Sequence, residues 1–160
     1  MNTTPHPPDL ILAIVTIETW PPVEKPYPYP RKQSTPPKVE PWCSYPIYLV
    51  NRGDVPLDIE YSTGGFASDD DHLVETSVSS DTAHVEPREA ALVETTDEGA
   101  FDFTFYYEVR VRAAGSAEIW RGILGVSRWG GGPLDRHEVD PVLQQNVRVI
   151  RAKDWRLETA

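Results

Sequence analysis

The segment from Tyr45 to Phe66 constrains the fold more than any other part of this chain. It consists of an apolar run, the turn-forming residues 51–54 (Asn-Arg-Gly-Asp), and a second run in which apolar and polar residues alternate. Alternation with a period of two indicates a β-strand with one buried face, and Asn and Gly suit the tip of a tight turn. The segment therefore predicts a β-hairpin. The buried side of its second strand would carry Val55, Leu57, Ile59 and Tyr61.

A longer alternating segment, from Phe101 to Ala113, predicts the strongest strand, with one face in the core and one in water. Its apolar face would carry Phe101, Phe103, Phe105, Tyr107, Val109 and Val111. Further strands are expected at residues 10–19, 47–51, 55–62, 72–78, 90–95, 117–126 and 146–151. Short strands separated by turns rich in glycine and proline predict an all-β fold, an antiparallel sandwich rather than an α/β fold.

A proline-rich segment interrupts this pattern, because nine prolines stand between Pro21 and Pro46. Proline lacks the N–H group that a sheet ladder requires and it fixes φ. We therefore expect residues 21–46 to form an extended, polyproline-like connection and not a central strand. Helix is expected only as one or two short turns, the clearest at Asp140-Pro141, where aspartate would cap the turn and proline would occupy its first position.

The size and charge of the chain narrow its class. Its 160 residues fit a single β-sandwich domain, 1–160, with a flexible N-terminus over residues 1–8. A net charge of −10 repels phosphate backbones, so nucleic acid is not an expected partner. The longest apolar run, Leu10–Ile17, is too short to span a membrane. With one cysteine, Cys43, and no signal-like start, we expect a cytoplasmic protein.

Two stretches resemble a known family. Residues 47–59 consist of an apolar strand that ends in Asn, a Gly-containing turn and a Pro-Leu pair that opens an alternating strand. This pattern resembles the immunoglobulin-like domains of the major-sperm-protein and PapD type. Residues 85–92 are similar to the corner that these domains place mid-chain, with Arg88 where they usually carry glycine. The resemblance implies an immunoglobulin-like β-sandwich that binds or scaffolds partners without catalysis.

Candidate chemical motifs are incomplete. Ser127 lies in a sequence one glycine short of a nucleophile elbow, and the scattered histidines match no zinc pattern. Acidic residues 69–71, with His72 and Glu75, could offer oxygen ligands to Ca²⁺, but they lack EF-hand spacing, so a solvated loop is preferred and calcium stays open. The Arg52-Gly53-Asp54 tripeptide is more simply a turn. We expect no catalytic residue, no cofactor and no resident metal.

These observations favour a non-enzymatic protein–protein interaction or scaffolding module, an accessory subunit whose partner is another protein. The expected contact residues are Tyr27, Tyr29, Arg31 and Trp129. The first three lie in the proline-rich segment, which could present aromatic rings at low entropic cost or could only cover a sheet edge. One alternative is a sandwich that binds carbohydrate or another ligand through exposed aromatic rings. A second is an enzyme with an unrecognised carboxylate site.

Overall fold

The computed structural model describes residues 5–24, 39–67, 73–74, 79–97, 104–126 and 135–158, which form strands and turns without a helix. None of these residues belongs to a helix that could cross a membrane. The strands are β1 (Leu10–Ile14), β2 (Ile17–Glu24), β3 (Val39–Asn51), β4 (Leu57–Ala67), β5 (Leu73–Val74), β6 (Ser79–Val85), β7 (Ala90–Asp97), β8 (Thr104–Ala113), β9 (Ile119–Val126), β10 (Asp135–Asp140), β11 (Gln145–Arg151) and β12 (Lys153–Glu158). The prediction of an all-β chain is confirmed.

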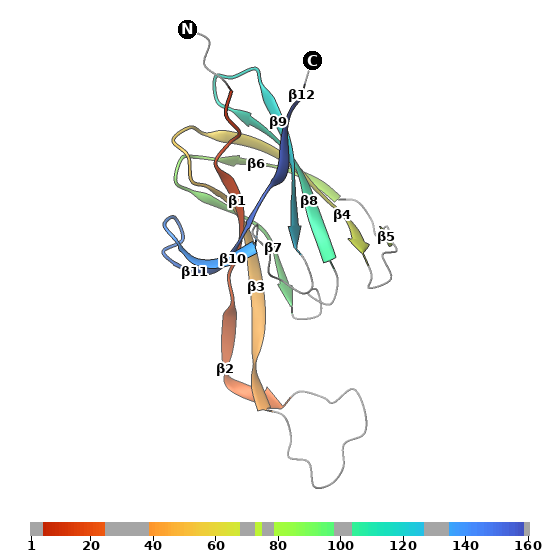
Figure 1. The fold of residues 1–160 in the computed structure, drawn as a ribbon. Helices are drawn as coiled ribbons and strands as arrows, with labels where there is room; N and C mark the ends of the chain where they lie inside the picture. Colours follow the sequence, from red (N-terminus) through yellow and green to blue (C-terminus); the bar gives the residue numbers. More distant parts are fainter. Residues whose placement is uncertain are drawn as a thin grey trace.

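The strands form two six-stranded antiparallel sheets that pack as a sandwich (Figure 1). Sheet A has the order β10-β11-β1-β3-β7. β1 and β2 pair with successive parts of the same edge of β3, and β7 pairs with its other edge. Ser44 of β3 shows this, because it pairs with both Ile17 of β2 and Asp97 of β7. Sheet B has the order β12-β9-β8-β4-β6, with β5 also beside β4. The outer parts of β2 and β3 project from the body of the sandwich as a two-stranded ribbon (Figure 1).

The core between the sheets is built from the inward positions of alternating strands. In β8, Tyr107, Val109 and Val111 are each 1% exposed, which confirms the predicted apolar face there. Phe101, Phe103 and the side chain of Phe105 lie outside the described residues. The buried members of this core are Leu10, Leu12, Ile14, Ile47, Leu49, Leu57, Ile59, Val85, Tyr107, Val109, Val111, Leu124 and Ile150.

The predicted hairpin at 45–66 is wrong in its connection, although both of its strands form. β3 belongs to sheet A and β4 to sheet B, so residues 52–56 cross from one sheet to the other. Buried Asn51 shapes this crossing, because its Oδ1 accepts a hydrogen bond from the Gly53 N–H at 2.9 Å. Its Nδ2 donates to the carbonyl oxygens of Val55 at 2.8 Å and Val85 at 3.1 Å. Alternation marks strands, but it does not tell which sheet a strand joins.

The second crossing, from β6 to β7, uses the corner at residues 86–89. Pro87 and Arg88 occupy its two central positions, and the Glu89 N–H donates to the Glu86 carbonyl at 3.2 Å. Arg88 has a φ of 61°, the left-handed conformation that usually selects glycine. The corner therefore has the positive φ of a type II turn with arginine at the glycine position. Backbone bonds of Arg88 and Glu89 with Asn51 join this corner to the first crossing.

The expectation that residues 21–46 form only a connection is wrong at both ends. β2 contains Pro21 and Pro22, and β3, which contains Pro41 and Pro46, lies inside sheet A. The Pro46 carbonyl accepts the Val15 N–H at 2.9 Å, so this edge of Pro46 faces the junction between β1 and β2. The ladder is interrupted at this junction, so the N–H group that proline lacks is not required there. This junction also divides the single strand expected at 10–19. Residues 25–38 lie outside the described part.

Three strands escaped the sequence analysis, namely β6, β10 and β12. β6 is rich in serine, threonine and aspartate and lies at a sheet edge, so it carries little apolar pattern. Of the strand expected at 72–78, the described residues contain only β5.

The turn expected at Asp140 is present as a single hairpin turn between β10 and β11. The Asp140 carboxylate accepts the N–H groups of Val142 at 3.0 Å and Leu143 at 2.6 Å, as a cap does.

Candidate functional site

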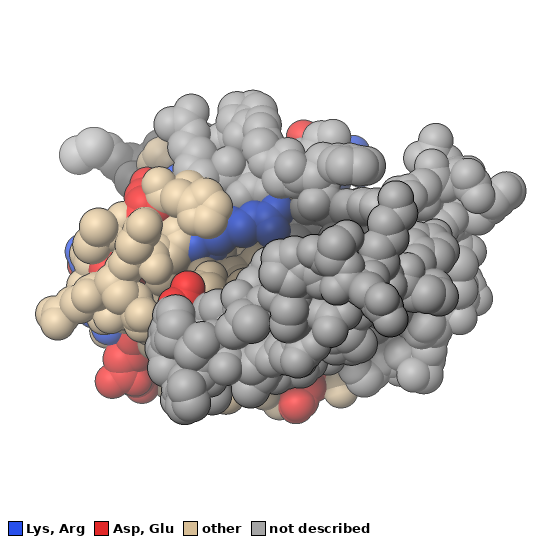
Figure 2. Space-filling view, turned by 90° about the horizontal axis from the view of Figure 1, so that it is seen from below, with Lys and Arg blue, Asp and Glu red and all other residues tan. Residues whose placement is uncertain are grey.

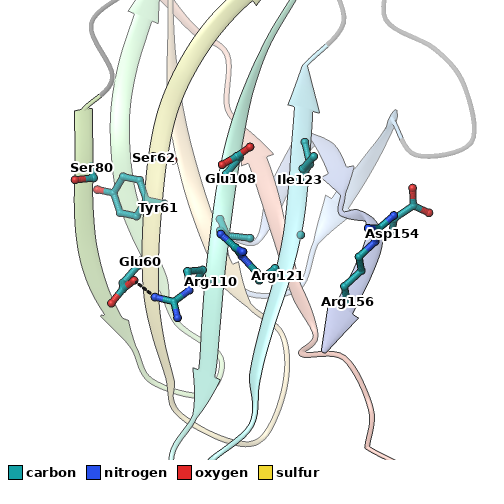
Figure 3. A pocket seen from close by; sticks show the side chains of 12 residues that line it. Glu60, Tyr61, Ser62, Ser80, Glu108, Arg110, Arg121, Ile123, Asp154 and Arg156 are labelled. Atoms are coloured by element: carbon teal, nitrogen blue, oxygen red, sulfur yellow. Dashed lines mark hydrogen bonds and ion pairs between the residues drawn. The ribbon is translucent and has the colours of Figure 1, made fainter. Parts of the chain in front are cut away.

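The outer face of sheet B carries a hollow of about 680 Å³ that crosses its strands and is lined mainly by polar and charged residues. Figure 3 shows its side chains standing on β6, β4, β8, β9 and β12. A second hollow of about 420 Å³ adjoins it and shares Glu60 and Arg110. Seen from below, Lys and Arg atoms of described residues lie together, with Asp and Glu atoms around them (Figure 2). Sheet B therefore offers a broad candidate surface among the described residues.

Strand register aligns three arginines across this face. Arg110 of β8 lies directly opposite Arg121 of β9, and Arg121 lies directly opposite Arg156 of β12. Directly opposed residues on neighbouring antiparallel strands have Cβ atoms about 5 Å apart and project from the same face. We call Arg110, Arg121 and Arg156 the arginine ladder. On the far side of Arg110, Glu60 of β4 continues the row.

Local sequence places each ladder residue outward. In β9, Gly122 and Leu124 are buried on the inner face, so Arg121 and Ile123 point outward. A Cβ on Gly122 would stand 2.7 Å from Trp155 Cε3, so only glycine lets the Trp155 ring lie this close to β9. This packing brings β12, with Arg156, against β9. An irregularity in register between Lys153 and Arg156, where Asp154 has a φ of 57°, lets Trp155 turn inward.

Only one arginine of the ladder has carboxylate partners among the described residues. Arg110 donates to Glu60 Oε2 at 2.7 Å and to Glu158 through Nε at 3.1 Å and Nη2 at 2.9 Å. The hydrogen bonds to Glu158 and then Glu60 raise the pKa of Arg110 above its usual value. The described part of the chain gives Arg121 and Arg156 no ion pair or side-chain hydrogen bond, and both are exposed. Two cationic groups are thus available to an external anion.

The rows beside the ladder carry a different pattern. The row nearer the β8 N-terminus consists of Ser80, Ser62, Glu108 and Ile123, and the opposite row of His84, Asp58, Arg112, Ile119 and Glu158. Ile123 is 46% exposed and gives the face its apolar spot. His84 Nδ1 lies 2.7 Å from Asp58 Oδ1, and its Nε2 lies 2.8 Å from Glu86 Oε1. Hydrogen bonds to Asp58 and then to Glu86 raise the pKa of His84.

This arrangement suits anion binding better than catalysis. Arginine presents a planar fork of donors that matches carboxylate and phosphate oxygens. Serines 62 and 80 line the larger hollow, but His84 engages carboxylates through both ring nitrogens and is not placed as a base for either serine. The residues that the structure describes contain no group of three or more side chains arranged to hold a metal ion.

A further polar contact lies beside the core, between Tyr107 and Glu94. The Tyr107 hydroxyl donates to Glu94 Oε1, and burial, followed by this bond, raises the pKa of Tyr107. An irregularity in register next to Ile47 turns Glu94 towards the inner face of β7. Nearby, burial and then Asp81 raise the pKa of Tyr61. These contacts satisfy polar groups at the margin of the core, so we assign them to structure.

Most side chains singled out by sequence lie outside the described residues. These are Tyr27, Tyr29, Arg31, Trp129, Ser127, the 69–71 loop, His72 and Glu75. Arg52 of the Arg-Gly-Asp tripeptide is described, and its Nε donates to Asp140 Oδ1 at 2.8 Å. Its Nη1 also donates to Glu138 at 3.1 Å. A guanidinium held in this way, 14% exposed, is not presented for adhesion.

The arginine ladder was missed by sequence reasoning. Arg110 and Arg112 occupy alternate, outward positions of the strand predicted at 101–113, but Arg121 and Arg156 stand far along the chain. Only the pairing of β8 with β9 and of β9 with β12 places them in one row. The one signal available in advance was the occurrence of arginine at outward positions in a chain with a net charge of −10.

Comparison with known proteins found no matching family model, no matching curated protein and no matching solved structure.

Proposed function

We propose that this chain is a non-enzymatic protein-interaction module and that the outer face of sheet B is its partner surface. The observation that carries the proposal is the arginine ladder, in which Arg121 and Arg156 lie on a wide, open hollow without carboxylate partners among the described residues. Arginine is enriched at protein interfaces because it combines charge, a planar donor fork and apolar stem area. The partner would be another protein, and this chain would serve as an accessory subunit of a larger assembly.

The strand order supports an immunoglobulin-like assignment as part of the same proposal. β1, β3 and β7 share sheet A, whereas β4, β8 and β9 share sheet B. In an immunoglobulin domain the first, second and fifth strands share one sheet, and the third, sixth and seventh share the other. β6 departs from the constant-domain arrangement because it pairs with β4. The β10–β11 hairpin and β12 would be additions at the sheet edges.

The proline-rich segment supplies a second element of the proposal. Residues 25–38 join β2 to β3, which form the ribbon that projects from the sandwich in Figure 1. Tyr27, Tyr29 and Arg31 would add contacts there, and Trp129 would add another from the 127–134 segment. Replacing Tyr27 and Tyr29 by alanine is expected to weaken partner binding by about 1–2 kcal/mol with little change in thermal stability. Lost stability with intact binding would assign the segment to covering the sheet.

Affinity purification of the full-length chain from the cells that express it tests the partner surface. Arg121→Glu reverses a charge at the centre of the ladder, and Arg88→Glu makes the same change at an exposed corner outside the ladder. We expect proteins that are enriched by the unaltered chain and by Arg88→Glu but lost with Arg121→Glu. An identical set of proteins with all three chains would contradict this use of sheet B.

A ligand-binding function has one specific observation in its favour. A hollow of about 260 Å³ at the end of the sandwich is lined mainly by apolar groups, among them Trp120, Val55, Pro7 and Pro8. A half-buried indole in such a wall can stack on a small apolar or sugar ring. Quenching of tryptophan fluorescence by a small-molecule or oligosaccharide panel, abolished by Trp120→Ala, would favour this second function over the first.

A further inference from the structure

We propose that the partner segment recognised by sheet B is an extended, acidic peptide whose alternate carboxylates bind Arg121 and Arg156. This inference rests on the proposed function and names the chemistry of its partner. Its basis is the charge pattern of the face, in which three arginines stand in register while only Arg110 is neutralised within the described residues.

The ladder is electrostatically unfavourable in the free protein. Like charges directly opposite on neighbouring strands destabilise a sheet. Glu60 and Glu158 offset the charge of Arg110, so the uncompensated pair within the described residues is Arg121 with Arg156. Glu158 approaches Arg110 rather than either of the other two arginines. A ligand that brings carboxylates to Arg121 and Arg156 would remove this repulsion, so the binding energy has a source already present in the fold.

The spacing of the two arginines suits an extended peptide. Neighbouring strands lie about 4.8 Å apart, and alternate side chains of an extended segment lie about 7 Å apart on one side. The flexible stems of Arg121 and Arg156 cover this difference, so two carboxylates two residues apart can each meet a guanidinium group. Ile123, 46% exposed and two residues along β9 from Arg121 on the same face, offers an apolar contact for an aliphatic side chain of the same segment.

The surrounding charges favour a peptide over a polyphosphate. Glu108 and Asp154 line the same hollow, and Glu60 closes the row beyond Arg110. A nucleic acid would carry phosphates past these carboxylates as well as past the arginines. A peptide can place acidic residues only where the arginines stand and neutral or basic residues where the carboxylates stand.

Fluorescence anisotropy with the full-length chain tests the proposal. The probe is a short labelled peptide of alternating glutamate and threonine, compared with peptides in which glutamine or lysine replaces glutamate. We expect only the acidic peptide to bind, with an affinity that falls as salt is raised. Arg121→Gln with Arg156→Gln should weaken binding at least about tenfold, which corresponds to two lost charge-assisted contacts. The matched control Arg88→Gln should leave it unchanged.

Three outcomes would overturn the inference. The first is equal binding of the glutamine peptide, and the second is no peptide binding alongside binding of inorganic phosphate or an oligonucleotide that depends on the same arginines. The third is self-association in sedimentation velocity that the double variant abolishes, because the face would then hold a second copy. If the acidic peptide fails while Arg121→Glu still removes a native partner, the acidic-peptide inference falls and the proposed function stands. If no native partner depends on Arg121, the proposed function falls instead.

Discussion

The outer faces of the two sheets differ in what covers them. On sheet A, Ile11, Ala13 and Val15 of the N-terminal strand segment join Val50, Val147 and Val149 in a second buried cluster, and Val142 and Leu143 from the β10–β11 turn pack against it. On sheet B the corresponding positions hold the arginine ladder and its neighbouring rows, which the described residues leave open to solvent. The part of sheet A around β1, β3 and β11 is thus buried on both sides, whereas the described part of sheet B is buried on one.

The sequences of the strands show the same difference between the two sheets. Every residue of β1, Leu-Ile-Leu-Ala-Ile, is buried, as a strand with two covered faces requires. β4 alternates, with Leu57 and Ile59 buried between exposed Asp58 and Glu60. A continuous apolar run thus marks a strand inside two layers of packing, and an alternating one marks a strand at the surface of the sandwich.

Charges follow the same division. Next to the covered face, Arg52 lies against Asp140, whose side chain is fully buried, with Nη2 2.7 Å from Oδ1. Burial lowers the pKa of Arg52, but its hydrogen bonds to Asp140 and Glu138 outweigh this and leave it raised. Burial alone would raise the pKa of Glu138, but the hydrogen bonds from Arg52 and Arg151 outweigh burial, so the pKa is lowered overall. Buried charge is compensated here, whereas Arg121 and Arg156 have no described compensation.

Breaking the compensated pair should have the largest effect. Asp140→Asn removes the charge opposite Arg52 and weakens the bonds that hold the turn over the second cluster. We expect a loss of about 3–5 kcal/mol in the free energy of unfolding, measured by urea denaturation, because a largely buried guanidinium loses its buried carboxylate partner and keeps only the partly exposed Glu138. Glu138→Gln, at the partly exposed partner of Arg52, should cost at most about 1 kcal/mol. Equal costs for the two variants would mean that Asp140 is not the buried anchor.

Two neighbouring residues of β9 compare the inside and outside of sheet B directly. Leu124 is fully buried in the core and Ile123 is 46% exposed on the outer face. Leu124→Ala should cost about 2–5 kcal/mol, the loss of burial plus a cavity. Ile123→Ala should change the free energy of unfolding by only about 0.5 kcal/mol. Similar losses for both variants in parallel urea titrations would show that the outer face is packed rather than open.

The fold was predictable from sequence to the extent that it depends on local patterning. Alternation in β4 and β8 marks strands with one covered face, and Asp140 before Pro141 marks a capped turn. Sheet membership is not local, because Asn51 can end a strand before a hairpin or before a crossing between sheets. What decides is the pair of bonds from its side chain to Val55 and Val85, and Val85 lies 34 residues away.

The candidate site was less predictable for the same reason. A row of side chains across a sheet consists of residues that are distant in sequence, so Arg110, Arg121 and Arg156 become neighbours only through register. Polar edge strands such as β6 show no alternation of apolar and polar residues, so the strand at one border of the site could not be predicted from sequence either. The prolines of β3 led to the wrong prediction of a connection in place of a strand. Their effect depends on which neighbouring strand faces the missing N–H group, as at Pro46.

Neutralising single arginines should separate a compensated charge from an uncompensated one on the bare face. Arg121→Gln removes repulsion from Arg156 in the ladder and should leave the free energy of unfolding unchanged or raise it by about 0.2–1 kcal/mol. Arg110→Gln removes the contacts with Glu60 and Glu158 and should lower it. Both effects should shrink in high salt. A larger loss for Arg121→Gln than for Arg110→Gln would mean that Arg121 has a stabilising partner.

The smallest effect concerns His84, at the edge of the bare face between Asp58 and Glu86. Two carboxylates favour the protonated ring, so the pKa of His84 should lie above the ordinary value of 6.5 in an NMR titration. Because the folded-state pKa is raised, this contribution to stability is present below pH 6.5 and is lost as the pH rises through the folded-state pKa. Asp58→Asn should lower the pKa, whereas Asp54→Asn, which alters the ion pair with Arg88, should not. An ordinary or depressed pKa in the unaltered protein would show that the carboxylates do not hold the histidine in solution, and that this part of the face carries free negative charge.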